Sequence, residues 1–180
     1  MSRYTEVFRF SPEGNIISEA ILLKKALFYL VQFTWGLAQN LVGLIGYLVL
    51  YRKCRHERFE NAFITLIDSD KPFGGVSLGI FIFINGKKDE DWLHDTRTHE
   101  YGHTIQSLVL GPVWPLVIAI PSVIWCNFPP LCKYRKEKNV SYYALYCEGW
   151  ANLWGSKASG QKFVTQELLQ RGRFGKPIQQ

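Results

Sequence analysis

Two long apolar stretches stand out in the alternation of hydrophobic and polar positions. Residues 26–51 and 104–132 contain no charged side chain, and each exceeds the roughly 20 residues that cross the hydrocarbon core of a bilayer. The first stretch belongs to a helical pattern over residues 17–51, which predicts an apolar anchor and one transmembrane helix. Polar side chains at its centre are costly in lipid unless they are buried against protein. A helix packed on the rest of the protein and a shorter membrane-dipping hairpin therefore stay open.

The second stretch is interrupted by prolines. Five of them fall between residues 112 and 130, which argues against one straight helix. Basic residues follow both stretches. If each stretch crossed once, the two basic groups would face opposite sides, against the positive-inside bias. We therefore predict that segment 112–132 is broken and either re-enters the membrane or lies in its interface.

Between these stretches the pattern changes to that of strands. Residues 63–67 and 76–84 are rich in Ile, Phe and Val, and turn residues separate them, which predicts a β-hairpin over residues 62–86. Asp95 is the expected N-cap of a helix over residues 96–110.

A later helix is expected within "VSYYALYCEGWANLW", so that helices occupy most of residues 95–155. A basic tail with a short helix near 164–170 follows, over residues 156–180. The chain is thus predicted to be one α+β domain over residues 1–180, and its length suits a single domain.

The net charge of +6 does not indicate nucleic acid, because no RNA-binding signature or zinc-finger spacing occurs. The basic residues instead flank the apolar stretches, which favours anionic lipid headgroups as partners. They are Lys24, Lys25, Arg52, Lys53, Arg55, Arg58, Lys133, Arg135, Lys136 and Lys138.

The four cysteines have no C-x-x-C pairing and are read as free thiols, which favours a reducing compartment. No cleaved secretion signal is expected at the N-terminus. We therefore expect an integral protein of an inner or plasma membrane, with its site near the cytoplasmic face.

The stretch "HEYGH", residues 99–103, carries the clearest chemistry. On a helix, His99 and His103 stand one turn apart on the same face, and two imidazoles in that position bind one zinc ion. Glu100 projects beside the metal, where it can take a proton from water activated by zinc. Chance gives such a match in about one chain in two hundred of this length. Gly102 costs about 1 kcal/mol inside a helix, which suggests that another helix approaches closely. The alternative is a surface helix with two solvated histidines.

A catalytic zinc site commonly has a third protein ligand. His94 lies about 140° around the helix from His99 and faces elsewhere. No histidine occurs six residues after His103, so the extended metzincin pattern is excluded. Glu148 is the preferred candidate, because an unpaired carboxylate is expensive in its apolar, aromatic surroundings. Glu137, among lysines, is expected to be solvated.

Two residues near Glu148 are candidates for supporting roles. Asn152 shares its helix face, and its oxygen could accept the free ring N–H of His99. Ordinary surface polarity is the alternative for Asn152. Among the nearby tyrosines, Tyr143 is a possible hydrogen-bond donor to the transition state, although aromatic residues there more often serve packing.

The glycine-rich stretch "GGVSLG", residues 74–79, is a candidate for holding an extended substrate. An exposed strand edge binds a peptide by added-strand pairing, and small residues let another backbone approach. The expected substrate-binding residues are Gly75, Val76, Ser77 and Leu78. A glycine-rich hairpin that leads into a buried strand is the alternative.

"HEYGH" followed later by "E-x-x-x-N" resembles the gluzincin group of zinc metallopeptidases. "GGVSLGIFIFIN", "HEYGHTIQSLVLGP", "PLVIAIPS" and "YYALYCEGWAN" are similar, in this order, to a family of small, largely uncharacterised bacterial membrane proteins. The resemblance covers roughly residues 62–152. It implies a small zincin-like domain with His99, His103 and Glu148 as ligands and Glu100 as the base. Asn152 departs from the usual aspartate, which puts turnover in doubt more than metal binding.

We therefore expect a membrane-bound, gluzincin-like zinc peptidase with one Zn²⁺, which acts on a peptide or protein substrate and contacts membrane lipid. The first alternative is a non-catalytic, zinc-stabilised membrane scaffold or interaction protein. The second is a soluble domain that buries both apolar stretches in its own core.

Overall fold

The computed structural model describes residues 12–71 and 73–164, so the helix predicted near 164–170 lies almost wholly outside the described residues. The strands are β1 (Arg55–Phe59), β2 (Ala62–Ile67), β3 (Gly75–Leu78) and β4 (Phe81–Asn85). The α-helices are α1 (Pro12–Thr34), α2 (Leu37–Leu50), α3 (Glu90–Leu110), α4 (Ile120–Asn127), α5 (Pro129–Glu137) and α6 (Tyr146–Ser159). Short helical turns are η1 (Gly111–Val113), η2 (Pro115–Ala119) and η3 (Tyr142–Ala144). The α+β class is confirmed.

The sheet has the strand order β1-β2-β4-β3. Its outer pairs are antiparallel, whereas β2 and β4 run parallel, from Phe63 beside Phe81 to Ile67 beside Asn85. The predicted hairpin over 62–86 is therefore wrong, because its two strands do not pair as a hairpin. The apolar run 76–84 is itself the hairpin, folded at Gly79, whose φ of 68° favours glycine.

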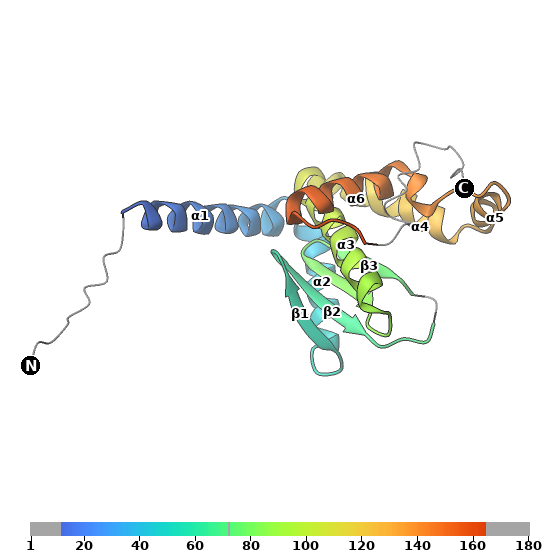
Figure 1. The fold of residues 1–180 in the computed structure, drawn as a ribbon, viewed down its shortest axis with the longest axis horizontal. Helices are drawn as coiled ribbons and strands as arrows, with labels where there is room; N and C mark the ends of the chain where they lie inside the picture. Colours follow the sequence, from blue (N-terminus) through green and yellow to red (C-terminus); the bar gives the residue numbers. More distant parts are fainter. Residues whose placement is uncertain (1–11, 72, 165–180) are drawn as a thin grey trace, which may run out of the picture.

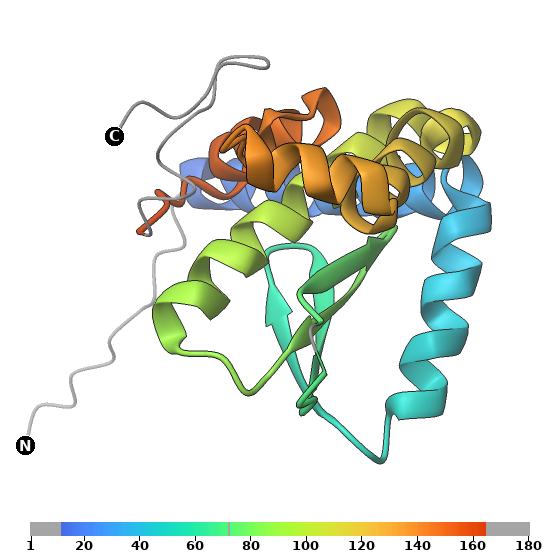
Figure 2. The same ribbon diagram turned by 90° about the vertical axis from the view of Figure 1, so that its right-hand side faces the viewer.

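The sheet lies between α2 and α3 (Figures 1 and 2). One face of β2 and β4 packs on α3 through Ile64, Ile82 and Leu93. The opposite face packs on α2, with Phe81 and Phe83 at its centre. Helix α6 covers the side of α3 that the sheet leaves open (Figure 2). The two helices that carry the expected ligands are thus held together inside the domain.

The first apolar stretch is two helices and not one, which corrects the predicted anchor helix over 17–51. Helices α1 and α2 meet at an angle of 95°, and α1 extends away from the domain (Figure 1). The amide side chains of the stretch, Gln32, Gln39 and Asn40, are buried near the bend. The Gln32 amide donates to the Thr104 carbonyl (3.0 Å), and the Asn40 amide donates to the side-chain oxygen of Gln32 (2.8 Å). Hydrogen bonds to α3 therefore fix the bend.

No single helix in the described residues has the length and apolar character to cross a membrane. Two pairs of consecutive helices meet both criteria when the two helices of a pair are counted together. The first pair is residues 18–34 with 37–50, and the second is residues 90–113 with 115–127, which meet at 119°. The second pair includes α3, most of which is buried within the domain. The predicted break of segment 112–132 is confirmed, because its prolines divide it among η1, η2, α4 and α5.

Helix α3 begins at Glu90, six residues earlier than expected. Asp89 is its N-cap and accepts the backbone N–H of Trp92 (2.9 Å), so the prediction that Asp95 caps the helix is wrong. Asp95 is instead fully buried within α3 and accepts the backbone N–H of Val164 (2.8 Å). Its carboxylate therefore fixes the end of the described chain to α3.

Candidate metal centre

Helix α3 presents both histidines of the motif on one buried face. The His99 and His103 rings lie 4.8 Å apart between centroids, at 87° to each other. Each residue is less than a tenth exposed. The one-turn spacing predicted for these imidazoles is therefore present. His94 lies near Asp95 and Gln161 instead, away from the pair, as expected.

Glu148 reaches the histidines from α6. Its Oε2 lies 3.1 Å from Nε2 of His99 and 3.4 Å from Nε2 of His103. One potential ligand atom from each of the three residues lies within 4.8 Å of the other two, and all three residues are buried. This group could hold a metal ion. Glu137, the rejected alternative, pairs with Lys133 at the surface.

Two glycines allow α6 to come this close. A Cβ on Gly102 would lie 1.9 Å from the Ala151 carbonyl oxygen, and one on Gly155 would lie 1.9 Å from the Thr98 carbonyl oxygen. Any side chain at either position would push the backbones apart. The close approach predicted from Gly102 is confirmed, and it is made by the helix that carries Glu148.

Hydrogen bonds on the far side of each ring fix the direction of its free electron pair. Nδ1 of His99 lies 2.6 Å from Oδ1 of Asn152, and Nδ1 of His103 lies 2.7 Å from Oε1 of Gln106. The Gln106 amide in turn donates to the Cys147 carbonyl (2.8 Å). With a cation bound, both Nδ1 atoms would keep their protons and each Nε2 would offer its electron pair on the side of Glu148.

The expected contact between Asn152 and His99 is thus present. The matching role of Gln106 was missed by sequence reasoning. Its position three residues after His103, on the same helix face, is the signal that could have revealed it.

The electrostatics of the group favour a cation between the three residues. Burial alone raises the pKa of Glu148, but the imidazoles, above all that of His103, outweigh burial and hold its pKa well below the usual range. Burial lowers the pKa of His103, but the Glu148 carboxylate reverses this and raises it to about 9. Oε2 of Glu148 is buried and accepts no hydrogen bond. A buried carboxylate oxygen without a hydrogen-bond partner, 3.1 and 3.4 Å from two imidazole nitrogens, fits a divalent metal.

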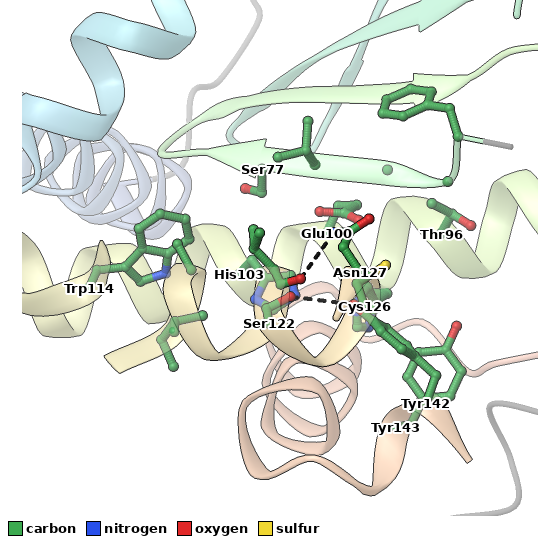
Figure 3. A pocket seen from close by; sticks show the side chains of 18 of the residues that line it. Ser77, Thr96, Glu100, His103, Trp114, Ser122, Cys126, Asn127, Tyr142 and Tyr143 are labelled. Atoms are coloured by element: carbon green, nitrogen blue, oxygen red, sulfur yellow. Dashed lines mark hydrogen bonds between the residues drawn. The ribbon is translucent and has the colours of Figure 1, made fainter. Parts of the chain in front are cut away.

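Glu100 lies next to the three donors and faces a pocket of about 550 Å³. Burial raises the pKa of its carboxyl. A Cβ on Gly75 would lie only 2.5 Å from Oε1 of Glu100, so glycine at this position makes room for the carboxylate. Figure 3 shows Glu100 and His103 between β3, which carries Ser77, and the side chains Tyr142 and Tyr143.

Three of the four expected substrate-binding residues line this pocket. Gly75, Val76 and Ser77 do so, whereas Leu78 packs with Phe81 away from it. The structure therefore does not bring Leu78 to the pocket with the other three residues. Side chains alternate along β3, so Leu78 points away from Ser77, which contacts Thr104 of α3, and packs on the α2 side of the sheet.

The tyrosines differ in their relation to the metal group. The Tyr143 ring lies 5.3 Å from the His99 ring and lines the pocket. The Tyr142 hydroxyl lies 3.3 Å from that of Ser122 on α4. The Tyr146 hydroxyl donates to the Val117 carbonyl. Tyr143 is thus the tyrosine in ring contact with a candidate ligand.

The pocket wall opposite β3 comes from η2 and α4, through Ile118, Ser122, Val123 and Cys126. Sequence reasoning did not include these residues in the site. The prediction treated segment 112–132 as membrane-embedded, whereas in the structure one side of that segment lines the pocket.

Comparison of the chain with protein-family models, with curated protein sequences and with solved structures finds no significant match. The resemblance to the gluzincins therefore stays a prediction, supported by the motif and by the geometry of the His99, His103 and Glu148 group.

Proposed function

We propose that this chain is a zinc-dependent, membrane-associated peptidase of the gluzincin type. One observation carries the proposal. Two Nε2 atoms and one carboxylate oxygen converge in a buried group, and that oxygen has no hydrogen-bond partner among the described residues. The carboxylate of Glu100 stands beside them in an open pocket.

Zinc is the metal that this donor set favours. Two imidazoles and one carboxylate, with a pocket beside them, match a catalytic zinc site with three protein ligands and an open position. When bound, zinc would supply Lewis-acid activation of a water molecule and of the substrate carbonyl. Asn152 and Gln106 would keep the two rings oriented for it.

The proton transfers belong to Glu100. Its carboxyl is raised in pKa by burial, which makes the carboxylate a better base than one in solution. Glu100 takes the proton from the attacking water and passes it to the nitrogen of the leaving amine. Tyr143, in contact with the His99 ring, is the candidate donor to the oxygen that becomes negatively charged.

A peptide is the substrate that suits the pocket wall. β3 is an edge strand, so one row of its backbone groups is not paired by a sheet neighbour. Gly75, Val76 and Ser77 of this strand line the pocket. A substrate in extended conformation would pair with this edge, which would bring one of its carbonyl groups past Glu100.

Membrane association is supported by exposed apolar side chains. On α1, Leu22 and Leu23 are 64% and 70% exposed, and Leu116 on η2 is 67% exposed. Surfaces of this kind on a soluble monomer are unusually apolar, and basic residues stand near them. Membrane lipid is the proposed partner, at an inner or plasma membrane with the metal centre near the cytoplasmic face.

The test measures metal and cleavage separately. Purified wild type should contain one zinc per chain and cleave members of a mixed peptide library. Glu100→Gln should keep the zinc and lose cleavage, because only the base is removed. His99→Ala and Glu148→Ala should lose both. Thr96→Ser, in the pocket wall on the same helix, is the matched control and should keep both.

Two results would count against the proposal. Cleavage by Glu100→Gln at the wild-type rate would exclude the mechanism. A full zinc content in wild type without cleavage of any peptide would favour a zinc-stabilised scaffold.

A further inference from the structure

A second cavity, of about 430 Å³, lies between α5 and η3. It shares Tyr142 with the wall of the metal pocket. Its polar lining includes Arg135 and Lys136 from α5, and Asn139 and Ser141 from the connection that follows. The cavity is therefore lined by two cations, an amide and a hydroxyl, and none of these residues has a part in the proposed hydrolysis.

The positive charge of Arg135 is not balanced by an acid of the described residues. It forms no ion pair with a carboxylate of the described residues. Its Nε is buried without a hydrogen-bond partner. Its guanidinium lies 5.3 Å from the Trp125 ring and 5.4 Å from the Tyr142 ring, which orient it without neutralising it. By contrast, Lys133 on the same helix pairs with Glu137.

We propose that this cavity binds the phosphate group of a phospholipid headgroup. A guanidinium recognises phosphate oxygens with paired N–H donors, and a lysine adds a point charge. The Ser141 hydroxyl accepts the backbone N–H of Tyr143 (3.2 Å), so its own proton can be donated to a ligand oxygen. The residues thus supply donors and positive charge to one small anion.

The lipid source is favoured by the apolar surface next to the cavity. The Arg135 guanidinium lies 3.5 Å from the Cys126 carbonyl, at the end of α4. On that helix and at its C-cap, Ile124 and Phe128 are each about half exposed. A phosphate in the cavity therefore adjoins a surface suited to acyl chains. This step rests on the proposed membrane association and not on peptide hydrolysis.

Vesicle flotation with the full chain carrying Glu100→Gln tests the proposal without interference from cleavage. Phosphatidylcholine vesicles are the main probe, because they present phosphate but no net charge, so general attraction of basic residues is suppressed. Vesicles of a neutral galactolipid lack phosphate. Arg135→Gln should weaken binding to phosphatidylcholine by about tenfold or more, as expected for lost charge-assisted hydrogen bonds, and leave galactolipid binding unchanged.

Two further variants make the result specific. Lys136→Gln, at an exposed position, should weaken phosphatidylcholine binding in the same direction. Lys133→Gln removes the same charge from α5 but lies outside the cavity, and should bind as the parent does. Unchanged zinc content shows that each variant keeps its fold.

Equal binding of phosphatidylcholine by Arg135→Gln and Lys133→Gln would overturn the headgroup site while membrane association stands. Calorimetric binding of inorganic phosphate that requires Arg135, with unchanged vesicle binding in Arg135→Gln, would identify a site for free phosphate and also overturn it. If the Glu100→Gln chain binds no vesicle, both the headgroup site and membrane association are overturned. The proposed peptidase activity of the wild type is independent of this result.

Discussion

Replacing Gly102 by alanine should separate the two helices that hold the candidate metal centre. The added Cβ would lie 1.9 Å from the carbonyl oxygen of Ala151 and 2.8 Å from its Cα. Both atoms belong to the backbone of α6, so no side-chain rotation can relieve the contact. The only relief is movement of α6 away from α3, and α6 carries both Glu148 and Asn152.

The size of the movement follows from van der Waals contact. A Cβ and a carbonyl oxygen do not approach closer than about 3.0 Å, so the helices must separate locally by about 1 Å. Overpacking of this kind costs about 1–3 kcal/mol of folding free energy. Metal–ligand distances tolerate only about 0.2 Å. Zinc affinity should therefore fall towards that of Glu148→Ala, although most of the fold persists.

Gly149→Ala supplies the matched control on α6. Its Cβ would meet a single atom, the Tyr143 carbonyl oxygen, at 3.1 Å, which a small adjustment can relieve. Gly155→Ala, whose Cβ would lie 1.9 Å from the Thr98 carbonyl oxygen, should behave like Gly102→Ala. The assay is zinc competition against a chromogenic chelator, with circular dichroism and thermal melting to follow the fold. Wild-type zinc affinity in Gly102→Ala would refute the argument that this backbone contact positions Glu148.

Three further outcomes follow from the site. Asn152→Ala should lower zinc affinity by about 10–100-fold through loss of the His99 contact, whereas Asn152→Asp should keep or raise it; equal affinities in chelator competition would contradict this. Because His103 of the metal-free protein has a pKa of about 9, zinc must displace its proton, so affinity should rise about tenfold per pH unit from pH 7 to 8.5. A flat profile, or calorimetric heats that do not vary with the buffer, would exclude that proton release. Gly75→Ala should displace the Glu100 carboxylate and lower kcat by tenfold or more while zinc content stays at one; an unchanged rate would show that Glu100 does not need the space.

The candidate metal-binding group could be predicted from sequence because its determinants are local. One helical turn separates His99 from His103, so their common face follows from the helix repeat alone. Glu148 could be found because a carboxylate in an apolar stretch needs a partner. Asn152 then followed from its spacing. Gln106 could be found by the same spacing argument, applied to α3 in place of α6, and was overlooked.

The course of the chain around the centre depends on contacts that a local pattern does not contain. The turn at Gly79 lies within an apolar run and leaves no signal in the local pattern. Its hydrogen-bond partner is distant in sequence, because the Ile80 backbone N–H donates to the side-chain oxygen of Asn40 on α2 (2.9 Å). β1 was missed because its sequence, "RHERF", is largely polar, as suits a strand at the edge of the sheet. The bend between α1 and α2 requires Thr104 as a partner for Gln32, a residue far along the chain.

The mutual dependence of Glu148 and His103 has a consequence for the protein without a bound metal ion. The buried Glu148 carboxylate needs a neighbouring positive charge, and the raised pKa of His103, about 9, supplies one when no metal ion is bound. A proton on His103 would thus take the place of the metal's positive charge, so the charge between α3 and α6 would stay close to balanced. The emptied protein should retain its architecture and accept the ion again, with alkaline solution easing its return.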